Sequence, residues 1–256
     1  MTEYGLWGRD FAAGARYCNP MSDLSLPAGY ARIRTVGSFA ELVSTTFADG
    51  VNALVWPREL EGDFAEVVQR LGEGEGLRAL DEERLRGLDL SPAGRVAAER
   101  LIDDLALLRA QGLAPVLDCI HGYPRDDSGS VVPTDVYSFH ADRAPVQADT
   151  YLCTYTEAAS EGLRQEDAVL KVDVPEIRAA LLEEYGGAED EGFREFLEEN
   201  CYDLHYAARP GAVPFSFGFG HLWRIAIAYP DNPVPPCVHR APENRPGRPP
   251  RLLLIS

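Results

Sequence analysis

The chain has 256 residues, of which 41 are acidic and 24 basic, giving a formal net charge of -17 at pH 7. This length is enough for a sizeable core, and the negative charge, with no Lys/Arg stripe, disfavours nucleic acid and anionic membranes as partners. No apolar run approaches the roughly 18 to 20 residues of a membrane helix, and the first residues do not resemble a signal peptide. We therefore predict a cytoplasmic protein that acts on a small molecule or another protein.

The cysteines and the missing motifs exclude several classes of chemistry. The five cysteines are odd in number, widely spaced and never in a Cys-x-x-Cys pair: Cys18, Cys119, Cys153, Cys201 and Cys237. This argues against a zinc ribbon or a disulfide framework and favours buried thiols. The sequence also lacks a phosphate-binding loop with lysine, a Gly-x-Ser-x-Gly elbow and a dinucleotide-binding fingerprint.

Helical signals dominate residues 1–112. Ser38 to Glu41 form a capping box, and apolar residues at helical spacing follow over 60–71. The clearest helix begins with Ser91 as N-cap and Pro92 at its first position, and it stops at Gly112. Residues 51–56 are apolar and β-branched, which predicts a buried strand closed by Pro57. We expect a mainly helical N-terminal part that packs on the rest of the molecule.

Strand and turn signals dominate residues 113–256. Short apolar or β-branched runs occur at 114–120, 137–139, 150–155, 213–217, 222–227, 237–239 and 252–255. Many short strands separated by Gly/Pro turns are typical of a sandwich or barrel. Two helical patterns interrupt them, so we expect a helical insertion over 157–206. The predicted class is α+β, with a jelly-roll or cupin-like core in one structural unit with the N-terminal part.

His140, Asp142, His239 and Arg251 form the pattern that carries chemistry. His140 and Asp142 lie two apart, so on a strand their side chains point to the same face and can hold one ion. His239 ends a later strand and completes a set of two histidines and one carboxylate, which leaves open coordination positions on ferrous iron. Arg251 begins the last strand, where its guanidinium can form a bidentate pair with a carboxylate.

These residues and their order resemble the iron(II)/2-oxoglutarate-dependent oxygenases. The resemblance implies a double-stranded β-helix, Fe(II) on His140, Asp142 and His239, and 2-oxoglutarate as a cosubstrate whose far carboxylate is held by Arg251. It also implies O2 and a small-molecule substrate as partners. Residues 51–58, 139–155 and 238–254 further look like a bacterial family of unassigned function, which suggests no reaction.

The carboxylate of Asp142 narrows the reaction within this resemblance. Halogenases of the class replace it with a small residue, so the resemblance implies hydroxylation, desaturation or cyclisation after oxidative decarboxylation of 2-oxoglutarate to succinate. Tyr151 is a candidate donor to the cosubstrate carboxylate, although an aromatic residue on a strand is more often part of the core. Arg143 is a candidate contact for an anionic substrate group or, equally, a partner in a salt bridge on the barrel rim.

Several alternatives remain open from the sequence. His205, with Asp203 two residues before it, competes for a place in the metal site, although it falls at the end of a predicted helix. Arg240, Arg245 and Arg248 compete with Arg251. A cupin-type metal protein that does not use 2-oxoglutarate, or a noncatalytic interaction protein with structural histidines, would carry the same residues.

Overall fold

The computed structural model describes residues 24–156, 158–243 and 247–256. Cys18, Arg245 and the first 23 residues of the predicted 1–112 part lie outside these ranges. The helices are α1 (Phe39–Ser44), α2 (Phe64–Leu71), α3 (Glu82–Arg86), α4 (Pro92–Arg109), α5 (Pro175–Tyr185) and α6 (Glu191–Glu199), with short 3-10 helices at Gln165–Asp167, Lys171–Asp173 and Tyr202–Leu204. No helix within the described ranges is both long and apolar enough to cross a membrane.

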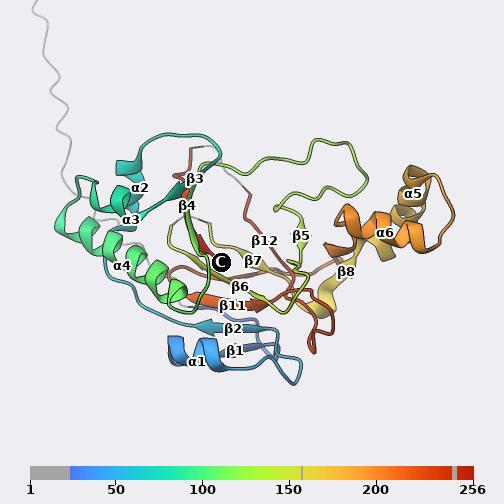
Figure 1. The fold of residues 1–256 in the computed structure, drawn as a ribbon, viewed down its shortest axis with the longest axis horizontal. Coiled ribbons are helices and arrows are strands. Elements are labelled where there is room, and N and C mark those ends of the chain that lie inside the picture. The colour runs from blue at the N-terminus through green and yellow to red at the C-terminus, as the bar shows by residue number, and fades with distance from the viewer. Residues whose placement is uncertain (1–23, 157, 244–246) are drawn as a thin grey trace, which may run out of the picture.

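The described strands form two sheets, so the predicted α+β class is confirmed (Figure 1). The first sheet has the order β1-β2-β11-β6-β13-β4-β3, and the second has the order β10-β7-β12-β5-β9-β8. The strands of the first sheet are β1 (Ile33–Thr35), β2 (Ala53–Trp56), β3 (Leu77–Leu80), β4 (Val116–Ile120), β6 (Asp149–Thr154), β11 (Leu222–Ala226) and β13 (Arg251–Ile255). Those of the second are β5 (Phe139–His140), β7 (Glu161–Gly162), β8 (Ala168–Leu170), β9 (His205–Ala208), β10 (Phe215–Ser216) and β12 (His239–Arg240).

The chain alternates between the sheets from β4 to β7 and again from β10 to β13. β4, β6, β11 and β13 belong to the first sheet, and β5, β7, β10 and β12 belong to the second. Residues from both inner faces, including Leu152, Phe217, Trp223 and Leu253, form one buried cluster between the sheets. Parallel pairing is confined to β1 and β2 among the named strands, since the other recorded pairs are antiparallel.

The N-terminal part supplies strands as well as helices. β1 and β2 extend the first sheet beyond β11, and β3 extends it beyond β4. The helices cover the outer face of this sheet, where Leu101 and Leu105 of α4 share a buried cluster with Leu252 and Leu254 of β13. The part predicted to be mainly helical thus also supplies the strands at both edges of the first sheet.

A buried ion pair fastens α4 to the sheet. The guanidinium of Arg58 donates to both carboxylate oxygens of Asp104, at 2.6 and 2.8 Å. The hydroxyl of Tyr155 donates to the same carboxylate at 2.6 Å. The side chains of Arg58 and Asp104 are only 7% and 5% exposed, so each depends on the other for compensation of its charge.

The predicted insertion over 157–206 contains both expected helices but is not purely helical. It contains β7, which lies between β10 and β12 in the second sheet, and its last two residues begin β9. The residue Cys201 has a positive φ of 57° and breaks the chain direction after α6. His205 directly follows the 3-10 helix Tyr202–Leu204, so it does lie at a helix end, and it also begins β9, which pairs with β5 and β8.

Candidate metal centre

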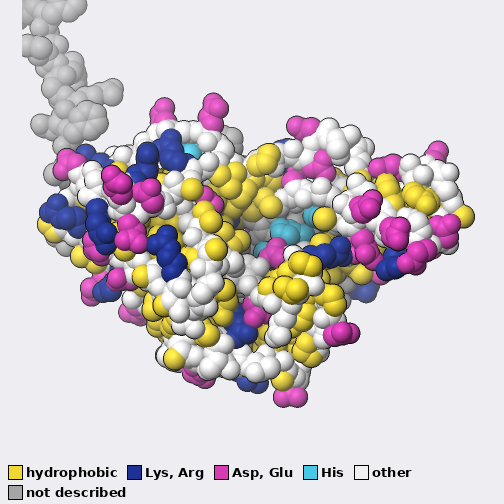
Figure 2. Space-filling model, viewed as in Figure 1, with side chains coloured by type: hydrophobic (Ala, Val, Ile, Leu, Met, Phe, Trp, Pro, Cys, Tyr) yellow, Lys and Arg dark blue, Asp and Glu magenta, His cyan; other side chains and the backbone are white. Residues whose placement is uncertain are grey.

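His140, Asp142 and His239 converge between the two sheets. Each offers one ligand atom, and the three atoms lie within 4.8 Å of one another. Nε2 of His140 is 3.8 Å from Oδ1 of Asp142, and Nε2 of His239 is 3.9 Å from Oδ2. Histidine side chains gather in a hollow between the part of the molecule that carries α2 to α4 and the part that carries α5 and α6 (Figure 2).

The second sheet brings the two histidines together. His239 of β12 lies directly opposite His140 of β5, so both side chains point to the same face, and their ring centroids are 4.6 Å apart. Asp142 lies just beyond the end of β5, where its backbone carbonyl accepts a hydrogen bond from the amide of Ala228 at 2.8 Å. This backbone hydrogen bond to Ala228 helps to fix the position of Asp142, in addition to its spacing of two residues from His140.

Both imidazoles present the same nitrogen to the centre. Nδ1 of His140 lies 2.8 Å from the carbonyl oxygen of Ser138, and Nδ1 of His239 lies 3.2 Å from that of Cys237. A proton on each Nδ1 satisfies these carbonyls and leaves the lone pair of each Nε2 directed at the centre. Outer hydrogen bonds of this kind orient histidines that ligate metals.

The carboxylate of Asp142 is held in its ionised form. The hydroxyl of Thr150 on β6 donates to Oδ2 at 2.5 Å. Burial alone would raise the pKa of Asp142, but His239, the Thr150 hydroxyl and His140 outweigh burial, and the pKa is lowered. Burial, and then the neighbouring His239, lowers the pKa of His140 to about 4. The lowered pKa values of His140 and Asp142 favour a neutral imidazole and an ionised carboxylate at neutral pH, which are the donor states that metal binding requires of these two residues.

The geometry fits one ion with a small adjustment. Two atoms that are each about 2.1 Å from the same ion can be at most about 4.2 Å apart. Each histidine meets this limit with one oxygen of Asp142, His140 with Oδ1 and His239 with Oδ2. The set of donors, two nitrogens and one carboxylate, suits a ferrous ion with open coordination positions.

Arg251 is buried on the inner face of the first sheet without an acidic partner. Its exposed fraction is 7%, and Nη2 donates to the hydroxyls of Thr154 at 2.9 Å and Ser160 at 2.6 Å. Nη1 lies 3.3 Å from the hydroxyl of Tyr123. Within the described ranges no carboxylate lies within 4.0 Å of this guanidinium, and its Nε has no hydrogen-bond partner.

Three other arginines differ from Arg251 because each forms an ion pair with an acidic side chain. Arg58, Arg224 and Arg240 each form an ion pair at 2.6 Å, with Asp104, Asp149 and Glu161 respectively. A buried charge without a partner is costly, and burial lowers the pKa of Arg251. An anion bound beside Arg251 would remove this cost.

Arg251 and His239 face one short stretch of chain. Ser160 contacts the guanidinium of Arg251, and Gly162, two residues later in β7, lies opposite His239. Two residues of extended strand span about 7 Å. A side chain at Gly162 would overlap the ring of Phe215, so glycine allows the aromatic packing that lines this stretch.

Two predicted residues lie away from the centre. Tyr151 is on the opposite face of β6 from Thr150 and Thr154, in the buried cluster beneath the helices, and it cannot reach a ligand of Arg251. The inner face of β6 belongs instead to Thr150, Leu152 and Thr154. Arg143 forms an ion pair with Asp203 and donates to the carbonyl of Glu198. This is the salt bridge that the sequence left as the equal alternative for Arg143.

The remaining histidines have different surroundings. His205 lies opposite His140 on β9, with the ring centroids 5.8 Å apart, but it is not part of the converging group. Nε2 of His121 lies 3.7 Å from the sulfur of Cys119, and His221 accepts a hydrogen bond from the amide of Arg58.

Sequence reasoning did not single out Thr150, Thr154, Ser160 and Tyr123 as site residues. Strand periodicity places Thr150 and Thr154 on the same face of β6, and this periodicity is the signal that could have identified them as site residues. Ser160 and Tyr123 reach Arg251 from loops, for which no periodicity exists.

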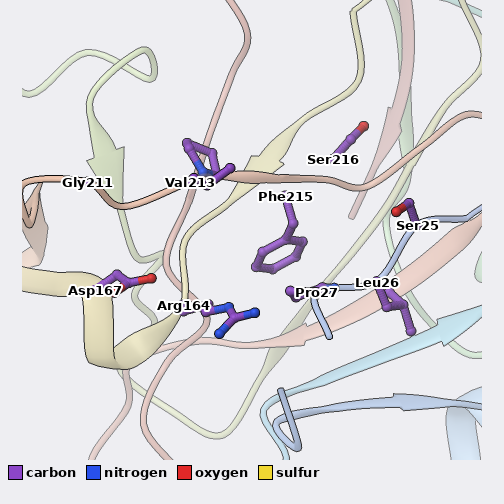
Figure 3. A pocket seen from close by; sticks show the side chains of 10 residues that line it. Ser25, Leu26, Pro27, Arg164, Asp167, Gly211, Val213, Phe215 and Ser216 are labelled. Carbon is purple, nitrogen blue, oxygen red and sulfur yellow. The ribbon is translucent and has the colours of Figure 1, made fainter. Parts of the chain in front are cut away.

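A second hollow of about 490 Å³ lies beside β10 and is lined by Ser25 to Pro27, Arg164, Asp167, Gly211 and 213–216 (Figure 3). The ring of Phe215 extends into it, between Leu26 and Pro27 on one side and Arg164 on the other. Arg164 donates to the carbonyl of Ala28 at 3.0 Å. None of the predicted site residues lines this hollow.

Comparison of the chain with models of protein families, with curated proteins and with solved structures finds no match.

Proposed function

We propose that the protein is a non-haem iron(II)/2-oxoglutarate-dependent oxygenase with a double-stranded β-helix core. The order of the strands supports this fold. The core has eight strands, which in chain order are β4, β5, β6, β7, β10, β11, β12 and β13. Their order in space is β4-β13-β6-β11 in one sheet and β5-β12-β7-β10 in the other. These are two interleaved sets of antiparallel strands, as a double-stranded β-helix requires.

The observation that carries the proposal is the unpaired Arg251 beside the three converging side chains. A metal site alone would be consistent with a cupin-type protein. Arg251 adds a buried cation that contacts three hydroxyls and, among the residues that the structure describes, has no acidic side chain within 4.0 Å. A cosubstrate with one end on a metal and a carboxylate at the other end matches both features.

Each residue then has a defined role. His140, Asp142 and His239 would hold Fe(II), and bound iron would supply activation of O2 coupled to decarboxylation of 2-oxoglutarate. Thr150 keeps the carboxylate of Asp142 oriented, and Thr154 and Ser160 keep the guanidinium of Arg251 oriented. Phe217, which belongs to the apolar cluster between the sheets, packs beside the ring of His239 with 6.4 Å between the ring centroids.

The proposed reaction is hydroxylation of a small-molecule or amino-acid-like substrate, or a desaturation or cyclisation that begins in the same way. The presence of Asp142 in the centre supports this choice over halogenation, which would need a small residue at that position.

Anaerobic spectroscopy tests the proposal. Fe(II) added to the metal-free protein together with 2-oxoglutarate should produce the weak visible charge-transfer band of the chelate. The Arg251→Met variant should bind iron but weaken 2-oxoglutarate binding by about 100-fold, because it loses a charged hydrogen-bonding partner. Arg209→Met is a matched control, since Arg209 is exposed and contacts only the backbone carbonyl of Glu166 in the recorded side-chain bonds.

Full iron loading without this band would contradict the oxygenase and leave a cupin-type metal protein. If the band forms, succinate release in air can then be screened against candidate metabolites.

A further inference from the structure

Two polar side chains flank the candidate metal centre and are not used by the proposed function. Lys171 is the single lysine of the chain, and it lies directly after β8. His205 begins β9, next to β8 and opposite His140. β8 and β9 continue the second sheet beyond β5, toward the end of the molecule that carries α5 and α6 (Figure 1).

Ser138 links Lys171 to the centre. The carbonyl oxygen of Ser138 lies 2.8 Å from Nδ1 of His140, and its hydroxyl accepts a hydrogen bond from Nζ of Lys171 at 2.6 Å. Ser138 thus connects the ammonium group of Lys171 to the imidazole of the candidate ligand His140 through one hydrogen bond of its hydroxyl and one of its carbonyl oxygen. His205 flanks the same imidazole from β9, with 5.8 Å between the ring centroids.

Both groups have unused bonding capacity. Nδ1 of His205 is buried and has no hydrogen-bond partner, and the residue is 4% exposed. Lys171 is partly buried, and within the described ranges no carboxylate lies within 4.0 Å of its Nζ. In a chain with 41 acidic residues, an ammonium group without an ion pair in this position is unexpected.

The acidic groups that act electrostatically on Lys171 or His205 already have other partners. Asp135 accepts hydrogen bonds from the amides of Asp126 and Tyr137 and lies 3.9 Å from Nη1 of Arg125. Asp126 accepts from Ser128 and from the amide and hydroxyl of Thr134. These carboxylates moderate the positive charge near Lys171 and His205 without forming an ion pair with Lys171.

We propose that Lys171 and His205 bind a carboxylate group of the substrate beside the metal centre. This inference rests on the proposed function, and it defines the substrate as an organic acid or a molecule with an acid group. One carboxylate oxygen can accept from Nζ of Lys171 and the other from an N–H of His205. A single lysine, an imidazole and two nearby aspartates suit one negative charge better than the two charges of a phosphate.

The single lysine gives a direct test. Protein labelled with 13C at lysine Cε has one such resonance, and the experiment uses the metal-free protein without 2-oxoglutarate. Titration with acetate should shift this resonance saturably, whereas acetamide and sodium chloride at equal ionic strength should not. The His205→Leu variant should weaken acetate binding about tenfold, and His121→Leu should leave it unchanged because His121 lies beside Cys119, away from Lys171.

Three results would overturn the inference. The first is a shift that does not saturate or that sodium chloride reproduces in the wild-type protein, which needs no variant to fold. The second is saturation by inorganic phosphate at lower concentration than by acetate. The third is loss of the iron and 2-oxoglutarate band in Lys171→Met, which would assign this position to the cosubstrate. Acetate binding is measured without iron, so the two tests give separate answers. Acetate can fail to bind while the iron and 2-oxoglutarate band forms, and acetate can bind while the band does not form.

Discussion

His140 and His205 lie directly opposite each other on β5 and β9, yet only His140 has a ligand nitrogen in the converging group. Nε2 of His140 is 3.8 Å from the carboxylate of Asp142, whereas Nδ1 of His205 is buried without a partner. Neighbouring histidines on one face of a sheet thus have different chemical surroundings.

We expect His140→Ala and His239→Ala each to weaken Fe(II) binding by roughly 100-fold or more, because each removes a ligand atom, while loss of an outer contact typically costs 10 to 100-fold. His205→Ala should change the affinity by less than about tenfold. Anaerobic titration with Fe(II) measures all three. Equal losses in His140→Ala and His205→Ala would show that the ligand set is wrong.

Thr150 and Thr154 provide a matched pair on the same face of β6. Thr150→Val removes the hydrogen bond to Asp142 and should weaken metal binding by about 10 to 100-fold. Thr154→Val removes a hydrogen bond to Arg251, so it should weaken 2-oxoglutarate binding and leave the metal affinity unchanged. The separate roles are refuted if both variants change the same affinity, as measured by titration of iron and then of 2-oxoglutarate.

The buried ion pair of Arg58 and Asp104 should affect the free energy of unfolding and not the set of metal ligands. Asp104→Asn leaves the charge of Arg58 buried and uncompensated, so we expect the free energy of unfolding to fall by about 3–5 kcal/mol. Glu82→Gln, in exposed pairs with Arg86 and Arg109, should change it by less than about 1 kcal/mol. Urea denaturation of the metal-free proteins compares them, and similar values for the two variants would contradict the role of burial.

The stability of the metal-free protein should depend on pH through His205. Burial, and then His140 and Lys171, lowers its pKa to about 4 in the folded protein, compared with about 6.5 in an unfolded chain. Between these values the unfolded chain binds more protons at this residue, so the contribution of His205 lowers stability as the pH decreases from about 6.5 to about 4 and is constant above that window. His205→Gln should make this fall shallower in urea denaturation at pH 5 and pH 7.5. An unchanged slope would show that other groups account for it.

Much of the fold follows from local sequence patterns. The helix that begins at Pro92 and the strands at 53–56, 116–120 and 251–255 have clear caps or apolar runs. β7, with the sequence Glu161-Gly162, has neither. It is a strand because β10 and β12 pair with it from distant parts of the chain, and such pairing leaves no local signal.

The positions of Tyr151 and His205 could not be predicted for a similar reason. Periodicity separates the two faces of β6 but cannot say which one is the interior, because helices cover one side of the sheet and the second sheet covers the other. His205 follows a helix and a 3-10 turn in sequence, so only its pairing with β5 reveals the strand. The spacing of His140 and Asp142 was informative because two residues are few enough for local geometry to hold.

The position of β13 has a consequence for biosynthesis. β13 is made after every other strand of its sheet, yet it lies between β4 and β6. Until it emerges from the ribosome, these two strands each have an open edge that can pair with another chain. The nascent protein is thus most prone to aggregation just before the residue proposed to anchor the cosubstrate is in place, and the strand that closes the gap also delivers that residue.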